Sequence, residues 1–532
     1  MTTAEYIAER LYRKGVRYVF GIPGGASIPY IDAFRKCGIE FILTSNESAA
    51  GIMADVTARL TGTPGICHAT LGPGATNLTT GAGGALLDRS AVIAFTSEVS
   101  RSMIHRTTQM NIDHQKLFEP VCKATFRMTP ENTAEVIDKA FHIAAAEYPG
   151  PVHIGLPSDL AGREVVTREN HFPEEKKDEN ENDVQGILDL LERSSRPVLA
   201  VGLTFARLGS DADLRAFLDR YKMPVVLTPM AKGVLDEGHP CYAGVLFHGL
   251  SDYLEDIFRD SDLVIGLGYD PVEYDYESWM PDIPLLHFNT VKTDLPQTET
   301  VKEFTGDPAD WFRILRQVNP GHFSFNRMAV ESMRTEMLSV FNGFTDHFGP
   351  VTALKVLQDE LPPESIITFD VGSHLHLAGQ FWNTRAKKNI IMTNGWSGMG
   401  FGLPAALAAK MARPVSPVVC VTGDGGFLMM AGEIITARRY NLPVIVVVLA
   451  DGELNLIRLK QTWENINPYA TRLYSGDLFD SDVFLGIRVI TADSEESMLN
   501  AVRESLSLNS PVIINARIDP DDYNWLVVRK KS

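Results

Sequence analysis

The stretch that decides the fold is Val418-Val419-Cys420-Val421-Thr422-Gly423-Asp424-Gly425-Gly426-Phe427. Its first half is an apolar, β-prone run that predicts a buried strand, and its glycines predict a tight turn into a helix. A buried strand that turns directly into a helix is typical of a parallel α/β sheet. Such sheets bind ligands at the carboxyl ends of their strands, where a helix N-terminus also offers backbone donors to a phosphate.

A second aspartate follows the next expected strand, which covers residues 443–450 and ends in Asp451-Gly452-Glu453. Asp424 and Asp451 are 451 − 424 = 27 residues apart. This is the length of one helix plus one strand, so both should emerge at the same edge of the sheet. Two carboxylates there can share a hard divalent cation such as Mg²⁺, which prefers oxygen ligands and phosphates. One Asp-Gly turn alone would be a plain turn, but the pair predicts a metal and phosphate site.

The rest of the chain repeats the alternation of strands and helices in three segments. We expect an α/β protein of three doubly wound parallel-sheet domains, over residues 1–162, 184–320 and 350–520. Thr3 is the expected cap of the first helix, and a small-residue-rich helix is expected over 48–60. Residues 164–183 are rich in charge and predict a solvated linker, and the pattern lapses again over 321–334. Strands are expected at 16–20, 65–70, 151–157, 197–202, 224–228, 262–268, 365–370, 417–422, 443–450 and 511–516.

Composition excludes several classes of protein. The 532 residues are 45% hydrophobic and 22% charged, and 49 basic against 67 acidic side chains give a net charge of −18. Such an acidic chain disfavours nucleic acid and membrane surfaces as partners. No apolar run is long enough to span a membrane and no secretory signal pattern is present. The five cysteines show no CxxC spacing, which disfavours zinc and disulfides and favours reduced thiols in a cytoplasmic protein.

Gly423-Asp424-Gly425 followed by Asp451 resembles the cofactor motif of thiamine diphosphate-dependent enzymes. The resemblance implies that Mg²⁺ takes the side chains of Asp424 and Asp451 and the backbone carbonyl of Glu453. Most members of the family have Asn-Asn where this chain has Ala450-Asp451. An aspartate keeps an oxygen ligand but adds a negative charge, and some catabolic acetolactate synthases resemble this chain in that respect.

A second match is Glu47, in the stretch 44–50, which resembles the strand-exit glutamate of the family. That glutamate hydrogen-bonds N1′ of the aminopyrimidine, and the resulting imino form removes the proton from C2 of the thiazolium. Taken alone, a glutamate here is more simply a helix N-terminal carboxylate that interacts with the helix dipole. The presence of Asp424 and Asp451 favours the catalytic interpretation.

The same resemblance assigns further cofactor-binding residues. Met399 would hold the cofactor bent, although a methionine is more often core filler, and Ser373 and His374 would reach the diphosphate. The whole expected set is Pro23, Gly24, Glu47, Pro73, Asn77, Gly372, Ser373, His374, Gly398, Met399, Gly423, Asp424, Gly425, Gly426, Asp451, Glu453 and Leu454.

Within the family, residues 21–26 and 118–121 resemble acetolactate synthases. The stretch 266–275 is similar to the FAD-independent, catabolic type, because no arginine occurs between Gly266 and Trp279 where FAD-dependent relatives carry them. Gly266-Leu267-Gly268 lacks the third glycine of a dinucleotide loop and predicts a structural turn. We therefore expect no FAD.

Several substrate-side residues keep two interpretations. Gln109 is the expected second catalytic residue, but Met110 stands at the family's usual glutamine position. Lys460 is most simply a surface lysine, and would favour an acidic substrate only if it faced the pocket. His105 and His114 could shuttle protons, but a single histidine in such a loop is more often structural.

The expected function is thiamine diphosphate- and Mg²⁺-dependent decarboxylation of a 2-oxo acid, most directly pyruvate, with ligation to a second carbonyl. Glu47 and Asp424 lie in different domains, and the family joins them across subunits, so a homodimer or homotetramer is expected. A non-ligating 2-oxo acid decarboxylase is the nearest alternative. A catalytically inactive cofactor-binding homologue is a remote one, because a mere binder has no need of Glu47.

Overall fold

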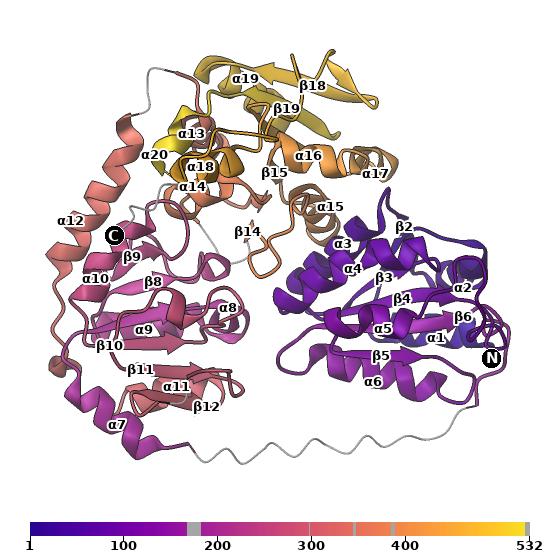
Figure 1. Cartoon of the computed structure of the whole chain (residues 1–532), viewed down its shortest axis with the longest axis horizontal. Coiled ribbons are helices and arrows are strands. Elements are labelled where there is room, and N and C mark those ends of the chain that lie inside the picture. The colour runs from indigo at the N-terminus through magenta and orange to yellow at the C-terminus, as the bar shows by residue number, and fades with distance from the viewer. Residues whose placement is uncertain (167–181, 297, 344–346, 385–388, 527–532) are drawn as a thin grey trace.

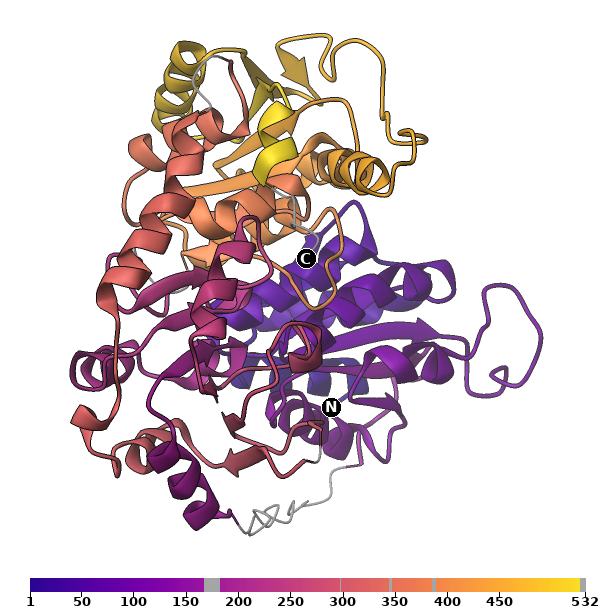
Figure 2. The same cartoon turned by 60° about the vertical axis from the view of Figure 1, so that its left-hand side comes forward.

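Three sheets with flanking helices build the molecule (Figure 1). The computed structural model describes residues 1–166, 182–296, 298–343, 347–384 and 389–526. We call the three sheets with their helices the first, central and third units. In Figures 1 and 2 the third unit, orange to yellow, lies above the other two.

The first unit begins with helix α1 (Thr3–Arg13), which buries Ile7 and Leu11. The prediction of Thr3 as its cap is wrong by one residue. The hydroxyl of Thr2 accepts from the Glu5 backbone N–H, and the Glu5 carboxylate accepts from the Thr2 N–H. The remaining elements are β1 (Tyr18–Gly21), α2 (Ile28–Cys37), β2 (Glu40–Leu43), α3 (Glu47–Thr61), β3 (Gly65–Ala69), α4 (Pro73–Leu87), β4 (Val92–Glu98), α5 (His114–Phe118), β5 (Ala124–Arg127), α6 (Thr133–Ala145) and β6 (Pro151–Pro157). The strand order is β2-β1-β3-β4-β6-β5.

The central unit has the strand order β12-β11-β10-β7-β8-β9. Its elements are α7 (Val184–Arg193), β7 (Pro197–Val201), α8 (Leu203–Leu208), α9 (Asp211–Arg220), β8 (Val225–Leu227), β9 (Tyr242–Val245), α10 (Glu255–Arg259), β10 (Leu263–Leu267), β11 (Leu285–Asn289), β12 (Val301–Thr305) and α11 (Pro308–Leu315).

Helix α12 (Arg327–Ser339) then leads to the third unit, in a stretch where the sequence pattern lapses. Among its residues only Val330 and Met337 are buried. A helix with so little apolar surface to cover shows no clear periodicity, which explains why the sequence does not predict it.

The third unit has the strand order β14-β13-β15-β16-β19-β18-β17. Its elements are α13 (Pro350–Glu360), β13 (Ile366–Phe369), α14 (Ser373–Phe381), β14 (Ile390–Ile391), α15 (Gly402–Ala412), β15 (Val418–Gly423), α16 (Asp424–Met430), α17 (Glu433–Arg439), β16 (Val444–Ala450), α18 (Asn455–Trp463), β17 (Val483–Phe484), β18 (Ile487–Ala492), α19 (Glu495–Ser507), β19 (Val512–Arg517) and α20 (Asp521–Leu526). Strands β17 and β18 pair antiparallel, and the other neighbours pair in parallel.

The predicted fold class, three parallel-sheet α/β units, is confirmed. Most of the predicted linker, residues 167–181, lies outside the described residues. All five cysteines are free, and four of them are buried. Within the part of the chain that the structure describes, no helix combines the length and apolar character needed to cross a membrane.

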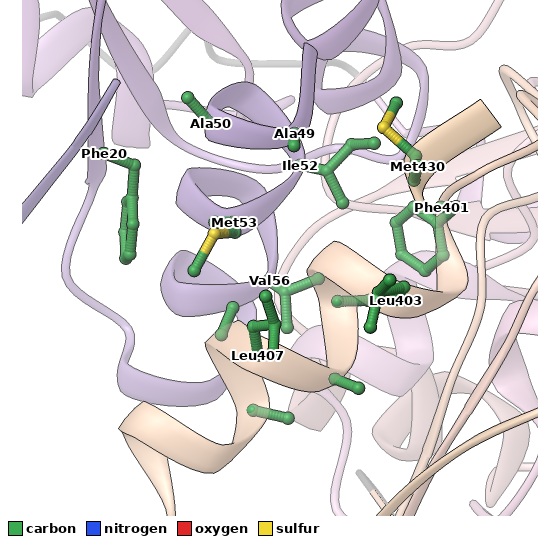
Figure 3. Close-up of a cluster of buried hydrophobic side chains, with 14 of the residues drawn as sticks. Phe20, Ala49, Ala50, Ile52, Met53, Val56, Phe401, Leu403, Leu407 and Met430 are labelled. Atoms are coloured by element: carbon green, nitrogen blue, oxygen red, sulfur yellow. The ribbon is translucent and has the colours of Figure 1, made fainter. Parts of the chain in front are cut away.

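The first and third units share a hydrophobic core (Figure 3). Val56 of α3 and Leu407 of α15 are among its fully buried side chains. Small residues allow α3 and α4 to approach closely, because a Cβ on Gly51 would stand 2.6 Å from the Cα of Gly81. Arg59 adds polar contacts to the same interface. It pairs with Asp55 of the first unit and donates to the backbone carbonyl of Met392, in the third unit, at 2.7 Å. This packing fixes the position of α3, which begins at Glu47.

Candidate functional site

The two aspartates of the predicted metal site lie side by side. Strands β15 and β16 pair in parallel with Gly423 opposite Leu449, so their carboxyl ends meet at one edge. The Asp424 carboxylate accepts a hydrogen bond from the Gly452 backbone N–H at 2.7 Å, which joins the two turns. Asp451 accepts from the Glu453 N–H at 3.0 Å. The arrangement is what two strand-exit aspartates on neighbouring parallel strands predict.

The surroundings of both carboxylates disfavour their ionised, negatively charged form. Burial raises the pKa of Asp424, and burial together with the charge of Asp424 raises the pKa of Asp451 to about 8. A bound cation would relieve both effects. Among the described residues no group of three or more acidic, histidine or cysteine side chains could hold a metal by itself. A cation between Asp424 and Asp451 would therefore need backbone or phosphate oxygens as further ligands.

The side chain of Glu453 is already engaged by protein. It accepts from the Thr471 hydroxyl at 2.5 Å and pairs with Arg458 at 3.3 Å. Its backbone carbonyl is therefore the part of Glu453 that could face a cation, as the family resemblance implies.

A cleft of about 110 Å³ opens beside this pair of aspartates. Met399 and Leu454 form part of its wall, and each has a methyl carbon 3.0 Å from where a Cβ on Gly425 would stand. Any side chain at Gly425 would fill this space. The predicted residues that line the cleft are Gly372, Ser373, His374, Met399, Gly423, Asp424, Gly425, Gly426, Asp451, Glu453 and Leu454. Gly398 precedes Met399 in the same loop and does not itself line the cleft.

Three buried side chains in the cleft have polar atoms without a hydrogen-bond partner among the residues that the structure describes. They are the hydroxyl of Ser373, Nε2 of His374 and the whole side-chain amide of Asn455. Burial lowers the pKa of His374 to about 4, so the ring is neutral at pH 7. Because buried polar groups are normally paired, the Ser373 hydroxyl and the Asn455 amide group fit an anionic ligand such as a diphosphate, whereas Nε2 of the neutral His374 ring is an acceptor and would donate to an anion only after protonation. Asn455, the first residue of α18, is missed by the sequence analysis, and its place at a helix start behind a strand exit is the signal that could have found it.

Asp370 does not line the cleft but holds two of the segments that form it. The sequence analysis does not identify Asp370 as a site residue. Its carboxylate accepts from the Gly400 N–H at 2.8 Å and from the Thr422 hydroxyl at 2.9 Å. Burial raises its pKa to about 6. Asp370 thus ties the Met399 loop to strand β15.

The first unit carries a separate cluster around Glu47. The Glu47 carboxylate accepts from the Asn77 amide at 3.0 Å, and Glu47 is 7% exposed. A Cβ on Gly74 would stand 3.1 Å from the same carboxylate, so Pro73-Gly74 passes directly beside it. Gly24 lies against Thr70, whose hydroxyl is 2.1 Å from where its Cβ would stand. Pro23 precedes it and is exposed. The structure therefore gathers Gly24, Glu47, Pro73 and Asn77 at one edge of the first sheet.

The loop after β4 carries Gln109 and projects from the first unit (Figure 2). Gln109 and His105 are exposed. The neighbouring Met110 backbone carbonyl is 2.9 Å from where a Cβ on Gly72 would stand, so the loop reaches the turn before Pro73.

His114 has a structural role. Its Nε2 accepts from the Gly72 backbone N–H at 3.2 Å, so this nitrogen carries no proton. Its Nδ1–H then donates to the Thr96 hydroxyl at 2.9 Å, and that hydroxyl donates to Nε2 of His153 at 2.7 Å. Burial lowers the pKa of His114. A proton shuttle through Nε2 would break the bond that holds the Gly72 turn.

The two clusters do not meet within one chain. No described residue of the first unit lines the cleft of the third unit. The turn before Glu47 is instead held on α17, because the Ser45 and Asn46 N–H groups both donate to the Glu433 carboxylate at 2.9 Å. Lys460 is exposed on α18 and does not line the cleft.

Comparison with known families matches the stretches of sequence that contain the two clusters. Residues 1–117 match the N-terminal TPP binding domain of thiamine pyrophosphate enzymes, 184–315 their central domain and 370–516 their C-terminal TPP binding domain. The chain belongs to the thiamine pyrophosphate enzymes. The predicted thiamine diphosphate dependence is thereby confirmed.

Its full-length relatives include the probable acetolactate synthase large subunit of Methanocaldococcus jannaschii, 30% identical over 98% of this chain and 92% of that protein. The acetolactate synthase isozyme 2 large subunit of Escherichia coli K12 is 30% identical over 99% and 97%. The acetolactate synthase of Bacillus subtilis 168 is 26% identical over 98% and 93%. The predicted resemblance to acetolactate synthases is confirmed.

Proposed function

We propose that this enzyme uses thiamine diphosphate and Mg²⁺ to decarboxylate a 2-oxo acid, pyruvate most directly, and to join the remaining fragment to a second carbonyl. When bound, thiamine diphosphate supplies a carbon nucleophile and a sink for the electrons that decarboxylation releases. Two clusters carry the proposal. One is the buried Glu47 in the first unit, and the other is the cleft of the third unit, where unpartnered polar groups lie beside two aspartates. The names of the full-length relatives support the same reaction.

In this proposal the Ser373 hydroxyl and the Asn455 amide group would donate hydrogen bonds to the diphosphate, and His374 would join them once its ring is protonated beside the anion. Asp424, Asp451 and the backbone carbonyl of Glu453 would hold Mg²⁺, whose positive charge would offset the buried carboxylates and the charge of a diphosphate. Met399 props the cofactor in a bent shape.

Glu47 is the proposed acid–base group at N1′ of the aminopyrimidine. The Asn77 amide, which donates to the Glu47 carboxylate, fixes the orientation of that side chain. Gly74 leaves room beside it, because any larger residue would press on the carboxylate. Gln109, an exposed residue of the projecting loop, is the proposed group that contacts substrate.

We propose that two copies of the chain share each active site, in a homodimer or homotetramer. The support is that Glu47 does not line the cleft of its own chain, so a second copy would complete the site. Mixing two inactive variants, Glu47→Gln and Asp424→Ala, tests this directly. A shared site predicts recovery of about a quarter of wild-type activity after random reassociation, since half of the dimers are mixed and each has one intact site. No recovery, with mixed oligomers shown by mass spectrometry, would refute sharing.

We also propose that FAD is not a resident cofactor. The support lies at the carboxyl edge of the central sheet, between β7 and β10, where a doubly wound sheet would bind a dinucleotide. There Arg89 pairs with Asp270 at 2.7 Å, and a Cβ on Gly202 would stand 2.5 Å from the Cα of Tyr269. Gly268 has φ +56° and packs on Phe205, as a structural turn requires. A flavin absorption band in the purified, active enzyme would contradict this proposal.

Product analysis distinguishes the proposed reaction from the alternatives. The enzyme is incubated with pyruvate, Mg²⁺ and thiamine diphosphate, and the products are identified by NMR. Acetolactate, or acetoin formed from it, supports ligation, whereas acetaldehyde indicates a non-ligating decarboxylase. If proton exchange at C2 of the bound cofactor is as slow as in free cofactor, the chain is a binder without catalysis.

A further inference from the structure

The segment 471–474 lies directly on the turn that carries Asp451. The Leu454 N–H donates to the Thr471 carbonyl at 2.8 Å, and the Leu473 N–H donates to the Gly452 carbonyl at 2.9 Å. These bonds form a short ladder between the segment and the turn 452–454. Tyr474, at the end of the ladder, points its hydroxyl at the metal site and donates to the Asp424 carboxylate at 2.9 Å.

The two oxygens of the Asp424 carboxylate are used unequally. Oδ2 accepts two hydrogen bonds, from the Tyr474 hydroxyl and from the Gly452 N–H at 2.7 Å. Oδ1 accepts one, from the Gly425 N–H at 2.8 Å. A carboxylate oxygen has about two acceptor positions. These bonds therefore occupy both positions of Oδ2, so that Oδ1 is the oxygen better placed to meet a cation.

The direction of the Tyr474 bond is fixed by chemistry. An ionised carboxylate accepts only, so the phenol must donate. An ordinary phenol is protonated at neutral pH. Tyr474 is thus a neutral donor to the Asp424 carboxylate, beside Asp451.

We infer that Tyr474 is a positioning residue that makes Asp424 a one-oxygen ligand, through Oδ1, and thereby favours Mg²⁺ over Ca²⁺ at this site. Mg²⁺ requires near-octahedral coordination with single-oxygen ligands, whereas Ca²⁺ accepts six to eight oxygens and binds carboxylates through one or both. Occupying Oδ2 with two protein donors excludes the two-oxygen mode. The inference rests on the proposed metal site at Asp424 and Asp451.

The test uses the full-length protein with thiamine diphosphate and measures the dissociation constants of Mg²⁺ and Ca²⁺ by titration calorimetry. Tyr474→Phe removes only the hydroxyl. Tyr469→Phe makes the same change five residues earlier, at a side chain that is 81% exposed, and serves as the matched control. Melting temperatures of the variants without metal show whether the substitutions disturb the fold.

For Tyr474→Phe we expect Mg²⁺ binding to weaken about tenfold, the scale of one hydrogen bond to a charged group. Ca²⁺ binding should change by about twofold or less, because the freed Oδ2 offers it a second oxygen. Tyr469→Phe should leave both constants unchanged. A parallel loss for both ions, or no loss for either, would overturn the inference.

The variant Asp424→Ala shows whether a negative result concerns only the role of Tyr474 or the proposed metal site itself. If Asp424→Ala binds Mg²⁺ as wild type does, the proposed site is wrong and the inference falls with it. If Asp424→Ala loses Mg²⁺ while Tyr474→Phe keeps the wild-type preference for Mg²⁺, only the role of Tyr474 is wrong.

Discussion

Asp451→Asn should stabilise the metal-free protein, because it removes a buried carboxyl that must hold its proton in the folded state, without changing the shape of the side chain. The folded pKa of Asp451 is about 8, against an ordinary value of 3.8. At pH 7 the folded protein keeps this carboxyl protonated, and the energy required is that of holding the proton about 3 pKa units above its ordinary value. That amounts to about 4 kcal/mol at most, at roughly 1.4 kcal/mol per unit.

The pH dependence of this effect has a definite sign. Between pH 4 and 8 the unfolded chain has released the Asp451 proton and the folded chain has not, so the wild-type free energy of unfolding falls as pH rises. An asparagine has no such dependence. The stability advantage of Asp451→Asn should therefore grow from pH 5 to pH 8 and level off above it.

Thermal denaturation in a chelator, without thiamine diphosphate, measures this difference, and Asp480→Asn on the exposed loop after α18 is the control. With saturating Mg²⁺ and cofactor the advantage should shrink, because the cation balances the wild-type charge. The variant should still bind cofactor, since its amide oxygen can replace the carboxylate oxygen. The reasoning is refuted if Asp451→Asn melts no higher than wild type at pH 8 in chelator, or if its advantage is the same at pH 5.

The remaining predictions concern the other groups of the site and the core beneath it. Glu47→Gln should leave cofactor affinity nearly unchanged and lower kcat by about 10² or more, the scale of acid–base assistance; wild-type turnover would remove Glu47 from the chemistry. Asp424→Ala should weaken Mg²⁺ and thiamine diphosphate binding together, so that activity partly returns at high concentrations of both, which a two-ligand titration of rate would show. Burial lowers the pKa of His68, His114 and His153, so acid protonates them in the unfolded chain first. Stability of the metal-loaded protein should accordingly fall from pH 7 to pH 5, and equal melting temperatures at both pH values would contradict this.

Local pattern explains which parts of the molecule can be predicted from the sequence. The apolar run before Gly423 and the run before Asp451 are strands with nearly the predicted bounds, because buried parallel strands are continuous apolar segments. Their adjacency then follows from the right-handed crossover of neighbouring α/β elements. The sequence alone therefore suffices to place the two aspartates together.

Residues that reach the site from irregular segments cannot be found in this way. Tyr474 lies 50 residues beyond Asp424, in a stretch without regular structure, and only the folded chain brings its hydroxyl to the carboxylate. Asp370 belongs to a predicted strand exit, but its bonds to the Met399 loop depend on tertiary packing. His114 is open to two interpretations because the sequence does not show that the Gly72 N–H points at its ring.

The core shared by the first and third units can be completed only late in the synthesis of the chain. Val56 of α3 packs in the same cluster as Leu407 of α15, and 407 − 56 = 351 residues separate them. At about 5–20 residues per second, the ribosome needs roughly 20–70 s to make that stretch. Throughout this interval the nascent chain presents the apolar side of α3 to its surroundings with its permanent cover still unmade. Chaperone binding to early intermediates of translation should accordingly centre on this helix and cease once α15 has emerged.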